Sequence, residues 1–69
     1  MKVIDKVLET RKSGNLTIDA GSTRSGLFGY EISMEGEIIY TGSGFLTLEE
    51  AMEDALSDIN NGETLTNEL

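Results

Sequence analysis

The chain has 69 residues, with 13 Asp and Glu against 5 Lys and Arg, which gives a formal net charge of −8. Cys, His, Trp and Pro are all absent. This composition excludes a thiol nucleophile, an imidazole base, a Cys/His zinc site and a disulfide scaffold. The excess of negative charge argues against direct binding to nucleic acid or to an anionic membrane. We therefore expect a single small non-enzymatic domain with no cofactor, no metal site and no catalytic residue.

The length also bears on the oligomeric state and the compartment. A domain of this size buries only about 60% of its unfolded surface and usually depends on disulfides, metals or oligomerisation. Without Cys or His, self-association as a homodimer is the expected solution. No segment approaches the roughly 18 apolar residues of a membrane span, and charge interrupts residues 1–5 before a signal-peptide core could form. These features predict a cytoplasmic protein.

Residues 1–12 have the pattern of an amphipathic helix. Apolar side chains recur at i, i+1, i+4 and i+5, namely Val3, Ile4, Val7 and Leu8. The following Ser13-Gly14-Asn15 is typical of a helix stop. We expect a helix over this segment.

Three strands are expected next, because apolar and polar residues alternate. The first covers residues 16–20 and is followed by a flexible loop over residues 21–26. The second covers residues 28–35, and a turn at Glu35-Gly36 leads into the third at residues 37–41. Residues 42–44 are expected to bend the chain towards the final helix.

The final helix has the strongest pattern in the chain. Its apolar stripe recurs at i, i+3, i+4, i+7, i+8 and i+11, namely Leu48, Ala51, Met52, Ala55, Leu56 and Ile59. Thr47 and Glu50 have the spacing of a capping box, and residues 60–62 are expected to end the helix. The expected fold is α+β, an α-β-β-β-α domain over residues 1–62 with helices on one face of an antiparallel three-stranded meander. Residues 63–69 are expected to be a disordered tail.

The charge is unevenly distributed along the chain. Residues 1–24 contain all five cations and three acids, a net charge of +2, whereas residues 25–69 contain ten acids and no cation. On the final helix, acids occupy the face opposite the apolar stripe and repeat at i, i+4, where like charges destabilise a helix by about 0.2–0.5 kcal/mol per pair. These acids are Glu49, Glu50, Glu53, Asp54 and Asp58.

The function predicted from this face is protein binding. Carboxylates bind Arg in the bidentate way that phosphates do, so the helix could occupy a nucleic-acid-binding surface of a basic partner as a DNA mimic. A virus- or mobile-element-encoded inhibitor has this size and charge. A second acidic patch is predicted at Glu31, Glu35 and Glu37, and Arg24 is a candidate interface anchor in its loop.

Two other hypotheses about the function remain open. The chain could be a structural or regulatory homodimer, paired through a sheet edge or the apolar helix stripe, with acids that only confer solubility. A carboxylate enzyme using Asp54 is the third reading, but it needs a cleft that 69 residues hardly allow.

Two motif matches are incomplete. Gly21 and Gly26 have the outer spacing of a phosphate-binding loop, but Leu27 and Phe28 stand where Lys and Ser or Thr are required. The segment from Gly29-Tyr30 to Thr47-Leu48-Glu49-Glu50-Ala51 resembles the hairpin-plus-helix of HicB-type antitoxin domains. This resemblance covers about half the chain and lacks the proline- and glycine-containing segment of those domains, so it does not assign the chain to the family.

Overall fold

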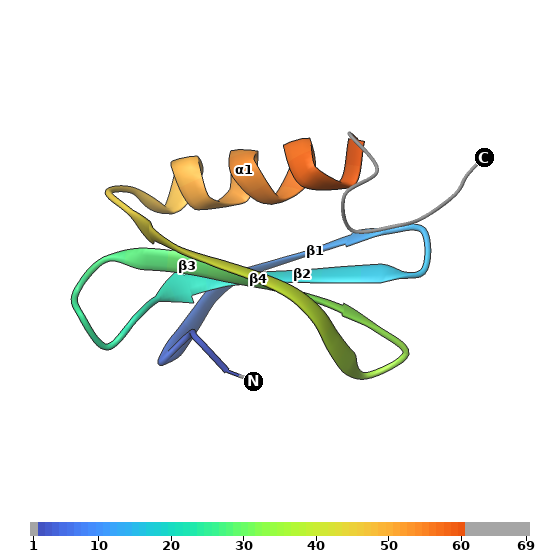
Figure 1. The fold of residues 1–69 in the computed structure, drawn as a ribbon, viewed down its shortest axis with the longest axis horizontal. Helices are drawn as coiled ribbons and strands as arrows, with labels where there is room; N and C mark the ends of the chain where they lie inside the picture. Colours follow the sequence, from blue (N-terminus) through green and yellow to red (C-terminus); the bar gives the residue numbers. More distant parts are fainter. Residues whose placement is uncertain (1, 61–69) are drawn as a thin grey trace.

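The computed structural model describes residues 2–60 as an antiparallel sheet with a helix packed on one face (Figure 1). The four strands lie in the sheet in the order in which they follow along the chain. The elements are β1 (Lys6–Ser13), β2 (Leu16–Ser22), β3 (Phe28–Met34), β4 (Glu37–Phe45) and α1 (Leu48–Asn60). The architecture is therefore a β-β-β-β-α meander closed by a helix.

The expected helix over residues 1–12 is wrong, because this stretch contains strand β1. β1 pairs with β2 across a two-residue turn, residues 14–15, that joins Ser13 to Leu16. Gly14 has a φ of 62°, as the first central position of a type II′ hairpin turn requires. The segment interpreted as a helix stop is thus a hairpin turn. The α-β-β-β-α fold with three strands is corrected to β-β-β-β-α with four strands, and one helix, not two, covers the sheet.

A β-bulge explains why β1 has the sequence pattern of a helix. The register with β2 shifts between Val7 and Glu9, which leaves Leu8 as the extra residue. An extra residue breaks the strand alternation and allows two neighbouring apolar residues, the same pair that a helical stripe contains. Neither of them joins a core, since Val7 is 45% exposed and Leu8 is 48% exposed.

The other three strands begin where they were expected, but two of them are longer. β2 continues through Gly21 and Ser22, which were expected to belong to the flexible loop over residues 21–26. Glu35 and Gly36 have φ values of 55° and 84°, which is the type I′ geometry favoured in two-residue hairpins. β4 continues to Phe45, so residues 42–44 belong to the strand and do not form a bend. A register shift near each end of the β3–β4 pairing accommodates this longer strand.

The core lies between the sheet and α1, as the apolar stripe of the helix predicts. β2 and β3 contribute every second residue to this face, and α1 contributes its inward face. The buried members are Leu16, Ile18, Ala20, Tyr30, Ile32, Ala51, Met52 and Ala55. Leu48, Leu56 and Ile59 pack against them with partial burial.

The start of α1 has the expected cap with one difference. The backbone N–H of Glu50 donates to the hydroxyl of Thr47 at 3.0 Å. The Glu50 carboxylate reaches back but accepts from the N–H of Leu46, at 3.3 Å, and not from that of Thr47. The side chain of Leu46 itself is 74% exposed and does not belong to the core.

The opposite face of the sheet is covered in part by the N-terminal segment, residues 2–5. The backbone N–H groups of Val3 and Ile4 donate to the carboxylate of Glu31, at 2.8 and 3.1 Å. Ile4 is 4% exposed and Glu31 is also 4% exposed. The N–H of Asp5 donates to the backbone carbonyl of Ser22 at 2.8 Å, which leads the segment into β1.

Two expectations fall on residues that the structure does not describe. The helix end at residues 61–62 and the tail at residues 63–69 lie outside the described part of the chain. Within residues 2–60, no helix is long and apolar enough to cross a membrane.

Candidate functional site

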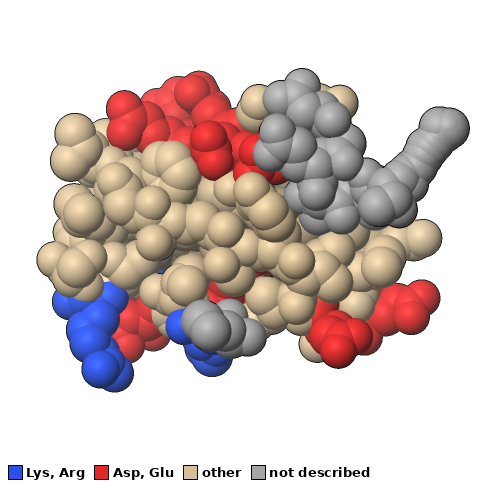
Figure 2. All heavy atoms as spheres, viewed as in Figure 1, with Lys and Arg blue, Asp and Glu red and all other residues tan. Residues whose placement is uncertain are grey.

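Three exposed carboxylates lie on the outer side of α1. They belong to Glu49, Glu50 and Glu53, and we refer to these three residues as the acidic surface. Figure 2 shows acidic side chains gathered along the helix side of the molecule. They lie there because the apolar stripe of the helix faces the sheet, which leaves the charged positions to solvent.

The acidic surface has no ion pair of its own within residues 2–60. In that part of the chain the only ion pair joins Arg11 Nε to Glu9 Oε2, at 3.0 Å on β1. Glu49 and Glu53 are one helical turn apart and repel each other. Arg11 lines a groove together with Glu49 and Glu53, but its ion pair is with Glu9, so the three carboxylates have no ion-pair partner among the described residues.

A shallow depression borders the acidic surface. It has a volume of about 390 Å³ and is lined by Glu50, Glu53, Asp54, Ser57 and Phe45. Carboxylates beside an aromatic ring are a favourable surrounding for a guanidinium or ammonium group. The depression could thus receive one cationic side chain.

Asp54 and Asp58 differ from the acidic surface because both are engaged with the core. The hydroxyl of Tyr30 donates to Asp54 Oδ2 at 2.9 Å and makes a shorter bond to Asp58 Oδ2. Since a tyrosine hydroxyl has one hydrogen, the two carboxylates share a single donor. These two acids therefore fasten α1 to β3.

The surroundings of Tyr30 raise its pKa well above the usual value of 10.0. The largest cause is burial, which disfavours the phenolate, followed by the hydrogen bonds to Asp58 and Asp54 and the negative charge of both. The phenol is thus held as a neutral donor, which is a structural role.

Tyr30 fits under the helix because Gly42 opposite it on β4 has no side chain. A Cβ at Gly42 would lie 2.5 Å from Cε2 of the Tyr30 ring. The ring also packs beside Tyr40 and Phe45, with centroids 6.4 and 5.8 Å away. Tyr30 therefore contributes to the packing between β3, β4 and α1.

The second predicted patch is divided between two places. Glu35 and Glu37 are exposed at the β3–β4 turn, which lies at the opposite end of the molecule from the start of α1 (Figure 1). Glu31 lies within β3 on the face that residues 2–5 cover, and it is buried. The structure therefore does not bring these three acids together.

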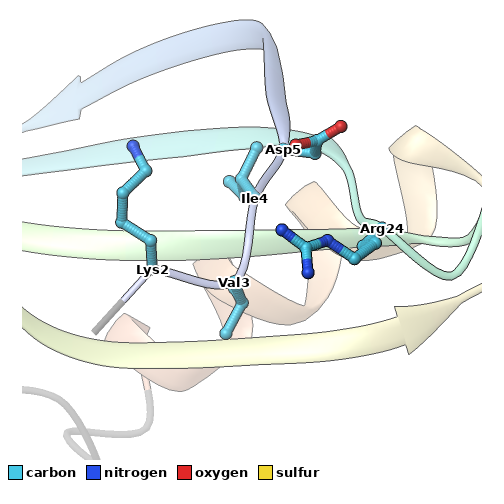
Figure 3. A pocket seen from close by; sticks show the side chains of 5 residues that line it. All are labelled: Lys2, Val3, Ile4, Asp5 and Arg24. Carbon is cyan, nitrogen blue, oxygen red and sulfur yellow. The ribbon is translucent and has the colours of Figure 1, made fainter.

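Arg24 lies in the β2–β3 loop beside the N-terminal segment. Figure 3 shows its guanidinium directed towards residues 3–4. Together with Lys2, Val3, Ile4 and Asp5 it lines a cavity of about 390 Å³. Arg24 is thus exposed, but on the opposite side of the sheet from α1.

Sequence reasoning missed a groove between β1 and α1. It has a volume of about 600 Å³, and its lining combines one edge of the helix stripe with charged residues of the helix and the strand: Leu48, Met52, Leu56, Glu49, Glu53, Glu9 and Arg11. The groove exists because α1 packs on β2, β3 and β4 and leaves β1 uncovered. The sequence did not predict this groove, because residues 1–12 were expected to form a helix and not the uncovered strand β1.

The comparisons with known proteins leave the site to be judged on its geometry. No protein-family model, curated protein or solved structure matches the chain. Within the described residues, no three Asp or Glu side chains gather as a metal-binding group.

Proposed function

We propose that the protein is a non-enzymatic binding module that docks the acidic surface of α1 on a basic surface of another protein. The observation that carries the proposal is that Glu49, Glu50 and Glu53 are exposed without an ion pair among residues 2–60. A helix selected only for stability gains from Lys at i, i+4 to Glu, and α1 has no cation at all.

The chemistry of the partner follows from the carboxylates. They match Arg and Lys side chains that otherwise bind phosphates, so a nucleic-acid-binding protein is the partner class, and the module acts as a DNA mimic that inhibits it. The depression beside Phe45 supports this assignment because it offers a place for one cation. We place this action in the cytoplasm, and a phage or mobile element is the origin that suits an inhibitor of this size.

The test compares two charge reversals of equal size. Glu49→Lys with Glu53→Lys changes the acidic surface, and Glu35→Lys with Glu37→Lys changes the β3–β4 turn by the same net charge. Glu50 is left intact because its carboxylate holds the N–H of Leu46 at the start of α1. Each tagged variant captures proteins from a cell lysate at low and high salt, and the affinity of each captured protein is then measured.

The expected result is a captured nucleic-acid-binding protein that elutes with salt and competes with duplex DNA. The helix pair should weaken its binding at least tenfold, about 1.4 kcal/mol, and flatten the salt dependence. The turn pair should retain most of the affinity. Equal binding by the wild type and the helix pair, with both folded, would show that the acidic surface is not the docking site.

A further inference from the structure

Among residues 2–60, strand β1 is an edge of the sheet that the helix does not cover. In this part of the chain it pairs with β2 alone, and α1 packs only on the other three strands. Exposed strand edges carry unpaired backbone groups that readily accept another strand. The exposed side chains of Val7 and Leu8 add apolar area to this edge.

The edge is regular over the residues after its bulge. Pairing with β2 continues without a shift from Glu9 to Ser13. A two-residue turn is closed by a hydrogen-bonded pair, here Ser13 and Leu16, and such pairs alternate along an antiparallel ladder. The alternation directs the backbone groups of Thr10 and Lys12 towards the free edge, where a further strand could bond to them.

The charges of β1 are complementary to those of a second β1. Glu9 and Arg11 lie on the face of the sheet that α1 covers, because their partners on β2 are the buried Ala20 and Ile18. If two copies pair antiparallel about Thr10, Glu9 of each copy lies opposite Arg11 of the other. Opposite charges in directly facing positions stabilise strand pairs, and like charges destabilise them.

The same charges disfavour the neighbouring registers. A two-fold axis centred on Glu9 places two carboxylates opposite each other, and one centred on Arg11 places two guanidinium groups opposite each other. An axis between residues is excluded because it would pair side chains from opposite faces of the sheet. Of these registers, only the one centred on Thr10 pairs opposite charges.

The other sheet edge lacks these properties. Strand β4 has two register shifts in its pairing with β3. Its charged residue is Glu37, and it has no cation to pair with a second copy. An edge that is interrupted in this way, with one acid and no cation, resists strand addition.

We propose that two copies of the chain associate through β1, antiparallel about Thr10, to form a continuous eight-stranded sheet. Small domains commonly gain stability by oligomerisation, and joining the edges satisfies backbone groups of both copies. Both helices then lie on the same side of the sheet, so the dimer presents two acidic surfaces in one direction. The proposal does not rest on the proposed partner, because β1 and the acidic surface are different parts of the molecule.

The test exchanges charges across the interface. Arg11→Glu places Glu9 opposite a second carboxylate, and Glu9→Arg places Arg11 opposite a second guanidinium group. Sedimentation over a dilution series in 0.15 M salt should show a dimer for the wild type and at least a tenfold higher dissociation constant for each variant alone. An equimolar mixture of the two variants should recover a dimer, which native mass spectrometry identifies as the heterodimer.

Lys12→Glu is the matched control. It changes the charge of β1 as much as Arg11→Glu does, but Lys12 lies on the other face and is opposite Leu8 in the proposed register. This variant should keep the wild-type dissociation constant within about threefold. A larger loss of dimer affinity for Lys12→Glu than for Arg11→Glu would overturn the register.

Two other results would overturn the proposal. The first is a wild-type chain that stays monomeric at millimolar concentration, and the second is a mixture of the two variants that forms no heterodimer. Amide exchange of the wild type gives a readout that needs no variant. The N–H groups of Thr10 and Lys12 should exchange more slowly as the concentration rises, and unchanged exchange would also contradict pairing at this edge.

Discussion

The carboxylates of this molecule form two groups that differ in what holds them. Glu31, Asp54 and Asp58 accept hydrogen bonds from the backbone of residues 3–4 or from Tyr30. Glu49 and Glu53 of the acidic surface, by contrast, lie in solvent with no ion pair among residues 2–60, and Glu50 is exposed beside them although its carboxylate accepts from the N–H of Leu46. The first group fastens parts of the fold together, and the second is available to a partner. Acidic residues that look equivalent in the sequence can thus contribute either to stability or to binding. Substitutions in the first group should lower the free energy of unfolding, and those in the second should not.

The largest effect on stability is expected at Gly42, where the lack of a side chain leaves room for the Tyr30 ring under α1. Gly42→Ala should destabilise the fold by about 3 kcal/mol, because its Cβ would overlap the Tyr30 ring that Asp54 and Asp58 hold. Urea unfolding measures this change, with Ser43→Ala, at an exposed neighbouring position, as the control. An unchanged midpoint for Gly42→Ala would show that the ring can move aside.

The next effect is expected at the buried carboxylate. Glu31→Ala should cost about 2 kcal/mol, since the N–H groups of Val3 and Ile4 lose their acceptor in a buried place. Amide exchange at these two residues should accelerate together with the loss of stability. Glu37→Ala, which removes an exposed carboxylate, should leave both measurements unchanged.

A smaller effect is expected when Tyr30 loses its hydroxyl. Tyr30→Phe should destabilise the fold by about 1 kcal/mol, because Asp54 and Asp58 are half-buried and water can replace part of the lost hydrogen bonding. Thermal unfolding gives the difference. A loss as large as that of Gly42→Ala would mean that the hydroxyl contributes more than the ring packing.

The same substitution should change the dependence of stability on alkaline pH. The pKa of Tyr30 is raised in the folded state, so its contribution is complete below the unfolded value of 10.0 and is lost as the pH rises above it. The free energy of unfolding should therefore fall more steeply above pH 10 in the wild type than in Tyr30→Phe. Equal slopes would contradict a buried neutral phenol.

The smallest effect is expected on the acidic surface, and it has the opposite sign. Glu53→Lys removes the repulsion from Glu49 one turn away, so the fold should gain about 0.2–0.5 kcal/mol. Glu37→Lys changes the net charge equally on a strand and serves as the control. A marked loss of stability in Glu53→Lys would place this residue with the fastening group.

The sequence predicted the helix, β2 and β3 because their periods are uninterrupted, and β4 was predicted as the strand that follows the turn at Glu35-Gly36 although its pairing has two register shifts. α1 has one apolar stripe from Leu48 to Ile59, and β3 alternates without a break from Phe28 to Met34. β1 was missed because the bulge at Leu8 breaks its alternation. The period of side chains is the main signal for secondary structure, and a bulge removes it.

The sequence predicted the part of the site that follows from the helical period and missed the part that depends on tertiary packing. The exposed faces of Glu49, Glu50 and Glu53 follow from the helical period alone. The burial of Glu31 depends on residues 2–5 crossing the far face of the sheet, which the expected N-terminal helix excluded. The bonds of Asp54 and Asp58 depend on where α1 lies over β3, and a single sequence contains no signal for that position.

The crossing of residues 2–5 beneath the sheet also determines how the molecule can be attached to another object. Because Glu31 holds this segment on the face away from α1, a tether joined ahead of Lys2 leaves from that side (Figure 1). A sensor surface or fusion partner linked there would therefore display the helix outwards. Immobilisation ahead of Lys2 would therefore orient the protein on the surface with α1 accessible to a binding partner.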